Sequence, residues 1–576
     1  MESQDPGTEN ETGTVPERKL LRLIAPKYPY INIYSHVAIP PLGLIYVGTA
    51  AALTGRYRVE IIDENNWRNN DHYALQQERP ADVVGFYCGL SSTMPRVFEL
   101  ATLYKKFGVL TIAGGGHVDA MPEEALHNGI DVVVRGEGEA ALIESMDAHF
   151  ASGSYACIPG LSYLNADGSI IIQKPRPPVA DLDTLPDPDF SLLVDTRRKV
   201  KFVPISRTRG CNYRCEFCSV NSRMGPARVS SYQKTLRHLE DLVAAGHRHF
   251  FFVDDNFAQD REGALALCEG IAAFQRKYHV RLNFTLQVRT QVARDPRLME
   301  ALKDAGAKVL CVGIESPIPE DLKNMHKGQN IADVEYDLRN MRRNGFLIHG
   351  MFIFGYPGKL GDESPHPLTL KQRADRYIDF ITRSRIDTLQ VLKAVPVPGS
   401  QLYERLKAEG RIYPLEVVGW DKYDGNFLLY QPDPGDNAVE LQEQATRIMH
   451  EFYSPWNMLK LLYLGPLSPI DWVFYFVRRG AQMLAVKRRE FEERYRKPFP
   501  AYGKLAEFFA QGASGATKEI YRIWRSTILR IFGSFALRGW ARGVNLKHFR
   551  QMLKHQQERI TNALPEYKKT RKKATE

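Results

Sequence analysis

The sequence predicts an α/β protein with an N-terminal doubly wound parallel sheet, a partial (β/α)6 barrel after it, and a mainly helical C-terminal region. Three observations lead to this prediction. Short β-rich runs alternate with helical patterns along two successive stretches of the chain, and a proline-rich connector separates these stretches. Beyond residue 400 the pattern becomes mostly helical. Because 576 residues exceed what one hydrophobic core supports, several domains are expected.

The first series of strands and helices is expected at residues 20–155, after a polar lead-in at residues 1–19 that we expect to be disordered. Helical patterns separate its β-rich runs, which lie at residues 19–25, 57–63, 82–88, 108–114 and 131–136. Ligands of such sheets bind at the carboxyl ends of the strands. The turns expected there are "GLSS" (89–92), "AGGGH" (113–117) and "RGEGE" (135–139).

Residues 156–198 are expected to form a linker, with a hairpin around the Asp167-Gly168 turn and a proline-rich extended stretch after it. The second series, at residues 199–400, predicts the partial barrel, with functional groups at the strand ends. Its six β-rich runs lie at residues 201–208, 249–256, 282–290, 308–316, 347–358 and 387–399. Residues 401–576 are expected to form a helical, basic C-terminal domain and tail. Apolar residues at 520–535 have helical spacing, and the basic end "EYKKTRKKATE" is expected to be disordered.

Charge and cysteine usage indicate the compartment. Residues 451–576 hold 25 Lys and Arg against 10 Asp and Glu, whereas the rest of the chain is close to neutral. No run reaches the roughly 18 apolar residues that span a bilayer. Seven cysteines without a paired pattern are typical of a reducing compartment rather than of a secreted disulfide scaffold. We therefore expect a cytoplasmic protein.

Three of the seven cysteines, Cys211, Cys215 and Cys218, lie within eight residues. Zinc usually takes four protein ligands, and neither a fourth nearby cysteine nor an interleaved histidine is present. A four-iron cluster held by three thiolates fits better, because iron–sulfur clusters are cysteine-ligated and three cysteines can wrap one face. Such a cluster would leave one iron open to a substrate or cofactor. Zinc or a structural role stays as an alternative. Cys311, in the middle of a predicted strand, is expected to be a buried core residue rather than a ligand.

The context of these cysteines resembles the radical S-adenosylmethionine (SAM) superfamily. They follow the first barrel strand with the spacing C-x3-C-x2-C, and four further segments match that superfamily in order: "VDDNF", "GIES", "FIFGYPG" and "PVPGSQLYE". The resemblance implies that Cys211, Cys215 and Cys218 hold a [4Fe-4S] cluster whose open iron chelates SAM. It also implies radical cleavage of SAM, followed by hydrogen abstraction from an unactivated carbon.

The same resemblance implies further SAM-binding residues. Phe217 would lean on the adenine, and Gly355 would let the backbone approach it. Glu315 and Ser316 would lie near the ribose or the methionyl end. The residues at the ends of strands two and three that would contact SAM or substrate, or else act as ordinary strand caps and salt bridges, are Asp255, Asn256 and Arg289.

The N-terminal domain, placed ahead of such a barrel, looks like the cobalamin-binding domain of a large radical SAM subfamily. The matching segments are "PPLGLIYV", "AGGGHVDAMPEEAL" and "VVVRGEGE". The resemblance implies that glycines admit the nucleotide tail of the corrinoid and that serines bond its phosphate or base. The implied residues are Ser91, Ser92, Gly114, Gly115, Gly116, Gly136 and Glu137.

One departure concerns the axial ligand of cobalt. The motif Asp-x-His-x-x-Gly, whose histidine binds cobalt in methionine-synthase-type domains, has no match in this chain. His117 stands alone after the glycines, and His36 is more simply a loop histidine than a cobalt ligand. The lower axial position is therefore expected to be empty or to hold water or another residue.

Three interpretations compete for the basic, aromatic C-terminal region: a solvated helical cap, peripheral contact with the inner face of the membrane, and nucleic-acid binding. No recognised nucleic-acid module supports the third, so no nucleic-acid partner is expected. Segments such as "GWDKYDGNFLLYQP" and "EFYSPW" look like those of the hopanoid methylases, which implies a hydrophobic, possibly lipid, substrate. An electron donor such as flavodoxin or ferredoxin is also implied.

The sequence therefore predicts a cobalamin-dependent radical SAM enzyme that methylates an unactivated carbon. Radical cyclisation or C–C bond formation without methyl transfer, as in the porphyrin-ring cyclases that the chain also resembles, is the alternative among enzymes. A non-catalytic sensor that binds a cluster or cobalamin is the alternative outside enzymes, and the intact SAM-site segments count against it.

Overall fold

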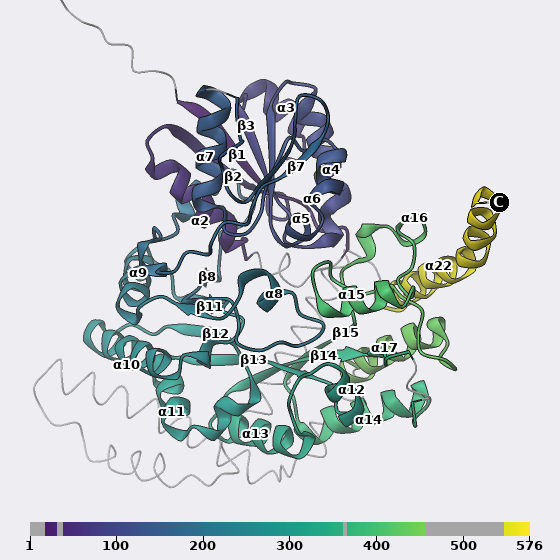
Figure 1. The fold of residues 1–576 in the computed structure, drawn as a ribbon. Coiled ribbons are helices and arrows are strands. Elements are labelled where there is room, and N and C mark those ends of the chain that lie inside the picture. The colour runs from purple at the N-terminus through teal and green to yellow at the C-terminus, as the bar shows by residue number, and fades with distance from the viewer. Residues whose placement is uncertain (1–17, 31–38, 152, 361–365, 455–545, 576) are drawn as a thin grey trace, which may run out of the picture.

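The computed structural model describes residues 18–30, 39–151, 153–360, 366–454 and 546–575. An N-terminal α/β domain lies over a larger, partly closed barrel, and helices that follow the barrel in sequence lie beside both (Figure 1). This arrangement confirms the predicted fold class.

The N-terminal sheet has seven strands in the order β2-β1-β3-β4-β5-β6-β7. The first five are parallel, as the alternation of strands and helices predicts: β1 (Lys19–Ala25), β2 (Tyr57–Asp63), β3 (Val83–Tyr87), β4 (Leu110–Gly114) and β5 (Val132–Val134). Buried apolar residues place α2 (Leu42–Leu53) and α7 (Gly138–Ala151) against one face. The other face is covered by α3 (His72–Glu78), α4 (Met94–Lys105), α5 (Gly116–Ala120) and α6 (Pro122–His127).

The hairpin around the Asp167-Gly168 turn joins the N-terminal sheet, whereas the sequence placed it in a linker. Its strands β6 (Leu161–Leu164) and β7 (Ile170–Ile172) add antiparallel strands to the edge of the N-terminal sheet, next to β5. The sheet thus extends beyond residue 155, where the sequence suggested that the domain ends and a linker begins. The reason is physical: a turn motif predicts that a hairpin forms but carries no information about which edge strand it joins.

The barrel sheet is parallel throughout, in the order β15-β14-β13-β12-β11-β8. All six strands fall within the predicted runs or begin one residue before: β8 (Val203–Ile205), β11 (His249–Phe252), β12 (Asn283–Val288), β13 (Ala307–Glu315), β14 (Leu347–Phe354) and β15 (Thr388–Lys393). In β12 and β15 alternate side chains are fully buried under the outer helices, and the others face the concave side. The outer helices are α9 (Tyr232–Ala244), α10 (Arg261–Tyr278), α11 (Pro296–Ala305), α13 (Ile331–Arg343) and α14 (Leu370–Ser384).

The region after the barrel is helical, as expected, and it packs on both domains. Helix α17 (Ala438–Phe452) contacts α14 and β15, while Trp420 and Tyr423 belong to the same buried cluster as the α4 side of the N-terminal sheet. Helix α22 (Leu546–Thr575) contacts α17 and α16 (Leu415–Val418).

The last residues, "EYKKTRKKATE", were expected to be a disordered tail, but they continue α22 as far as Thr575. The basic side chains of this stretch repel one another, yet the long apolar contact of α22 with the body of the protein nucleates the helix, which then propagates outward. The apolar residues of helical spacing predicted at 520–535 lie outside the described residues. No helix in the described ranges is both long and apolar enough to cross a membrane.

Candidate active site

The cysteine-rich loop, residues 210–227, begins and ends in a small antiparallel ribbon of β9 (Thr208–Arg209) and β10 (Arg228–Val229). Gly210 closes the loop at a position where no side chain fits. Its φ is +86°, and a Cβ there would lie 2.6 Å from the carbonyl oxygen of Gly225. The Cys211 N–H donates to that same carbonyl at 3.2 Å. The two ends of the loop are therefore pinned together beside the first cysteine.

The three cysteines line one cavity of about 150 Å³ at the carboxyl ends of the barrel strands. Five of the residues predicted to bind SAM line the same cavity: Phe217, Asp255, Asn256, Arg289 and Glu315. These residues come from the cysteine loop and from the ends of β11, β12 and β13, which a parallel barrel brings together at one rim. The juxtaposition predicted from the order of the motifs is thus present in the fold.

The surroundings of the three thiols affect their ionisation and their hydrogen bonds. Burial raises the pKa of the Cys218 thiol to about 11 and that of Cys211 above its ordinary value, so a bound cation is needed to hold them as thiolates. The Val220 N–H donates to the Cys218 sulfur at 3.5 Å, a contact typical of cluster-bound thiolates. Within the described residues, no three His, Cys, Asp or Glu side chains converge closely enough to enclose a single ion.

A buried ion pair lies across the cavity. The Lys327 ammonium donates to Glu315 at 2.6 Å, with both side chains less than a tenth exposed, and it also lies 5.9 Å from the centre of the Phe217 ring. Glu315 has a φ of +66°, an uncommon conformation for a residue other than glycine. Gly313 makes the pair possible, because a Cβ there would lie 2.5 Å from Glu315 Oε1. The sequence reasoning missed Lys327, which lies in an ordinary helix-to-helix turn.

Arg289 lines the cavity next to Lys327. Its guanidinium carbon lies 3.8 Å from the centre of the Tyr213 ring, and its Nη2 donates to the carbonyl oxygen of Lys327 at 2.8 Å. Among the described residues its Nε–H has no hydrogen-bond partner although it is buried. A buried donor left open in this way fits an anionic or carbonyl group of a ligand.

Asp255 adds a further carboxyl group to the cavity. Burial, together with the neighbouring carboxylate of Asp254, raises the pKa of Asp255 to about 6, and the more distant Arg223 opposes the rise. Asp254 itself turns away and accepts the backbone N–H groups of Arg207 and Thr208. Asp255 and Asn256 thus present polar atoms to the cavity, while Asp254 holds the strand end in place.

Two predicted residues do not line the cavity. The Ser316 hydroxyl donates to Asp321 at 2.7 Å and accepts the N–H of Ile318, so it caps its own turn. Gly355 has a φ of +71°, and a Cβ there would lie 2.7 Å from the Leu441 side chain of α17. Packing against a helix that follows the barrel therefore requires a glycine at this position, and its predicted role at adenine stays a prediction.

Cys311 also differs from expectation. It lines the cavity of the three predicted ligands instead of belonging to the apolar core. Because side chains alternate along β13, Cys311 faces the concave side with Gly313, while Leu310 and Val312 pack under the outer helices. Burial raises the pKa of its thiol to about 12.

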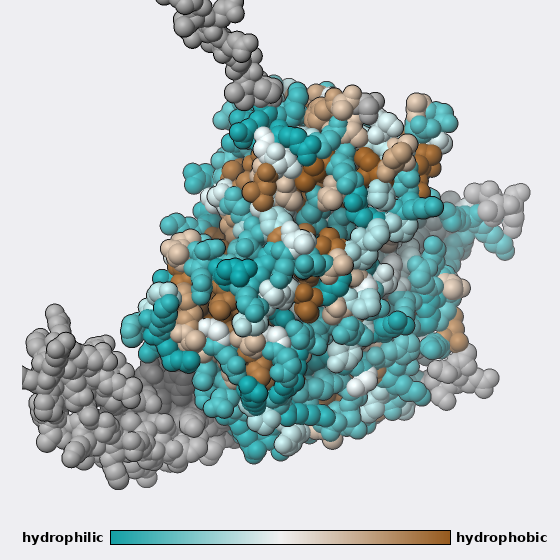
Figure 2. Space-filling model, turned by 60° about the vertical axis from the view of Figure 1, so that its left-hand side comes forward, coloured by the Kyte–Doolittle hydropathy of each residue, from teal (hydrophilic) through white to brown (hydrophobic). Residues whose placement is uncertain are grey.

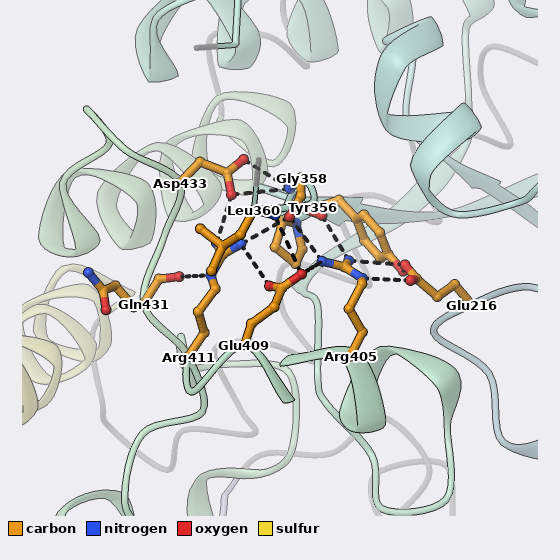
Figure 3. Close-up of polar contacts among 10 residues, drawn as sticks. Glu216, Tyr356, Gly358, Leu360, Arg405, Glu409, Arg411, Gln431 and Asp433 are labelled. Atoms are coloured by element: carbon orange, nitrogen blue, oxygen red, sulfur yellow. Dashed lines mark hydrogen bonds and ion pairs between the residues drawn. The ribbon is translucent and has the colours of Figure 1, made fainter. Parts of the chain in front are cut away.

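Glu216, between the second and third cysteines, anchors the loop to the barrel rim (Figure 3). Its carboxylate accepts the Tyr356 hydroxyl at 2.7 Å and two donors of Arg405, Nε at 2.7 Å and Nη2 at 3.1 Å. Arg405 lies on α15 (Gln401–Ala408) and also donates to the carbonyl oxygens of Pro357 and Gly358. The loop, the end of β14 and α15 are therefore joined through one buried carboxylate, which sequence reasoning did not single out.

A second cavity, of about 350 Å³, lies between the two sheets. Gly114, Gly115, Gly136 and Glu137 line it at the strand ends of the N-terminal sheet, opposite Ser206 and Val253 at the ends of barrel strands. Its inner part is apolar, with side chains that include Leu23, Leu42, Val47, Phe86, Ile112 and Leu142. The carboxyl ends of both parallel sheets thus face one another across this space.

The other predicted residues of the N-terminal domain lie outside this cavity. The Ser91 hydroxyl bonds Nδ1 of His117 at 2.9 Å, and Nε2 of that histidine bonds Glu124 at 3.0 Å. The Trp420 indole N–H donates to Glu124 and completes a buried polar chain on the far side of the sheet. Ser92 is buried in the adjacent turn. His117 therefore belongs to this polar chain, and His36 lies outside the described residues.

Gly116 does not line the cavity, but it borders the wall. It begins α5, and a Cβ there would lie 2.8 Å from Nη1 of Arg223, a residue of the loop that carries the cysteines. Glu137 lines the cavity with its charge already paired: it forms ion pairs with Arg209 at 2.9 Å and Arg228 at 3.0 Å, while Glu139 pairs with Arg209 at 2.6 Å. Its role in this structure is to join the two domains.

Comparison with known proteins agrees with this geometry. The family model of the radical SAM superfamily matches residues 205–363, and that of the B12 binding domain matches residues 31–145. The chain is a radical SAM enzyme with a B12-binding domain. This radical SAM enzyme is 25% identical to bacteriochlorophyllide d C-12(1)-methyltransferase of Chlorobaculum tepidum, over 83% of the present chain and 97% of that protein. It is 26% identical to the hopanoid C-2 methylase of Rhodopseudomonas palustris, over 73% of the chain and 72% of that methylase.

A solved structure shares the fold. The radical SAM methyltransferase TsrM from Kitasatospora setae, with cobalamin and a [4Fe-4S] cluster bound, superposes with a TM-score of 0.59 at 20% sequence identity. The match covers 76% of this chain and 90% of that one.

The residues of both cavities fit the cofactors of a radical SAM enzyme with a B12-binding domain. Three thiols with a backbone donor, beside the open Nε–H of Arg289 and the cavity-lining carboxyl group of Asp255, suit an iron–sulfur cluster and SAM. The apolar slot bordered by glycines at strand ends suits the nucleotide tail of a corrinoid.

Proposed function

We propose that this enzyme transfers a methyl group to an unactivated carbon of an apolar small molecule. The observation that carries the proposal is the placement of the two cavities. The thiol-lined cavity lies at the barrel rim, and the slot that fits a corrinoid lies between that rim and the N-terminal sheet. The short helix α8 (Val220–Met224), which directly follows Cys218, contributes lining residues to both cavities.

When bound, the cluster and SAM supply a radical that removes hydrogen from carbon, and the corrinoid supplies a methyl group. The chain's own residues hold and orient these groups. Cys211, Cys215 and Cys218 would hold the cluster, while Glu315 and Arg289 would orient SAM. The Glu315–Lys327 ion pair is buried, so its geometry is maintained with little competition from water.

An apolar substrate is supported by the names of the relatives, which act on a bacteriochlorophyllide and a hopanoid. An electron donor such as flavodoxin or ferredoxin would reduce the cluster.

Figure 2 shows that the described surface on the face in view is mostly hydrophilic, with apolar residues in small groups. Contact of this face with a membrane would therefore depend mainly on charge.

Peripheral contact with an anionic membrane is supported by the end of α22, where Lys568, Lys569, Arg571 and Lys572 are exposed. Each basic residue near an anionic surface contributes about 1 kcal/mol. A full-length variant with Lys568, Lys569 and Lys572 changed to Gln is expected to co-sediment less with phosphatidylserine vesicles than the wild type. Equal recovery of both proteins would contradict the contact.

The proposed reaction is tested by anaerobic reconstitution with iron, sulfide, cobalamin and SAM, followed by analysis of the products. S-adenosylhomocysteine and 5′-deoxyadenosine in similar amounts, with a methylated product, are the expected result. Deoxyadenosine without S-adenosylhomocysteine would instead indicate cyclisation or C–C bond formation without methyl transfer. A protein that binds cluster and cobalamin but never cleaves SAM would indicate a sensor.

A further inference from the structure

Arg223 is a charged residue that lines the cavity proposed to hold the corrinoid. Within the described part of the chain, its side chain has no partner for an ion pair or a hydrogen bond. It lies on α8, five residues after Cys218, and its side chain lines the cavity of about 350 Å³. In the described residues its guanidinium makes no hydrogen bond and no ion pair within 4 Å. The backbone of Arg223 is held by Ser219, so the side chain extends from an anchored position.

The other charges on this cavity wall are neutralised. Arg209 pairs with both Glu137 and Glu139, and Arg228 adds a second pair to Glu137. Two further carboxyl groups act on Arg223 only at longer range. Asp119 accepts the Gly136 N–H at 2.9 Å, and Asp255 faces the neighbouring thiol-lined cavity. Among the described residues, the wall therefore carries one positive charge that has no partner in direct contact.

The surroundings of Arg223 define the ligand it suits. Gly116 allows the guanidinium to lie against the start of α5, where a Cβ would come within 2.8 Å of Nη1. Beyond it the cavity becomes apolar, between α2, α7 and the sheet. A molecule that enters this cavity with an apolar, aromatic end would place the adjoining part of its structure next to Arg223, near the glycine turns. An arginine at such a point favours a phosphate, which it binds through two parallel N–H donors.

We propose that Arg223 binds the phosphodiester in the nucleotide tail of cobalamin, a proposal that rests on the function proposed above. The corrinoid would then be held by both domains, since the glycine turns belong to the N-terminal sheet and Arg223 belongs to the cysteine loop. Arg223 would also connect the position of the corrinoid with that of the cluster, because α8 directly continues the loop that carries Cys218.

The test measures binding of corrinoids to the full-length protein, without turnover. Three probes are compared by equilibrium dialysis: hydroxocobalamin, cobinamide phosphate, which keeps the anion without the base, and cobinamide, which lacks both. Arg223→Gln is expected to weaken binding of the first two by about 10- to 100-fold, the effect of losing hydrogen bonds to a charged group. Binding of cobinamide should not change.

Arg214→Gln is the matched control, because Arg214 lies in the same loop but is exposed. It should leave the binding of all three probes unchanged, and Arg223→Lys, which keeps the charge, should recover part of the affinity. Equal weakening of all three probes, or no weakening of any, would overturn the role of Arg223. If the wild type itself bound no corrinoid, the proposed function would fail as well, which separates the two outcomes.

Discussion

Replacement of Glu216 by Gln tests whether one buried carboxylate holds the cysteine loop on the barrel rim. The side chains of Glu216 and Arg405 are 5% and 14% exposed, and the carboxylate accepts three donors from Arg405 and Tyr356. Glutamine keeps the shape of the side chain but removes its charge. Its NH2 group is a donor and would face at least one of these three donors, which would then lose its acceptor. Removing one partner of a buried pair costs about 3–5 kcal/mol.

Arg405 keeps other partners after this change, which places the expected cost at the lower end of the range. It still donates to the carbonyl oxygens of Pro357 and Gly358 and lies 3.3 Å from Glu409. A cost of about 3 kcal/mol would lower the unfolding midpoint of a domain of this size by about 6–12 °C. Because the loop carries the cluster ligands, iron retention after anaerobic reconstitution should fall as well.

The assay combines differential scanning calorimetry with iron analysis of the same samples. Glu404→Gln is the control, because Glu404 lies on the same helix as Arg405 and is exposed. Tyr356→Phe removes a single hydrogen bond to the carboxylate and should cost about 1.5–3 kcal/mol. If Glu216→Gln had the unfolding midpoint and iron content of the wild type, the anchoring role of this carboxylate would be refuted.

Three further predictions follow from the same structure. Cys218→Ala should lower iron retention by about tenfold or more, whereas Cys311→Ala should retain iron. Equal loss of iron in both variants would instead make Cys311 a ligand. Glu137→Gln leaves Arg209 and Arg228 without their shared carboxylate, so proteolysis between the domains should accelerate, and an unchanged cleavage rate would argue against the ion-pair contact. Burial raises the pKa of Asp119 to about 6, so the folded, cobalamin-free protein loses up to about 3 kcal/mol of stability as the pH rises from 4 to above 6. Asp119→Asn should abolish this loss and be the more stable protein at pH 7.5 in calorimetry, and identical pH profiles would refute the assignment.

Much of the candidate site could be predicted because its signals are local in sequence. The spacing of Cys211, Cys215 and Cys218 restricts what the loop can bind, whatever its surroundings. Residues that end parallel strands, such as Asp255 and Arg289, meet at one rim because of the topology alone. Contacts that depend on what packs against a residue could not be predicted: Gly355 accommodates Leu441, and Ser91 bonds His117.

The sequence by itself determined two parallel sheets, a three-cysteine loop at a strand end and glycine turns opposite it, since periodicity and motif spacing act over short distances along the chain. Only the tertiary structure decided which partners complete the site. Lys327 reaches Glu315 across 12 residues, and Arg405 reaches Glu216 across 189. Arg223 meets the N-terminal domain only because that domain lies over the barrel. Such pairs carry no local pattern, because burial and charge compensation are properties of the packed chain.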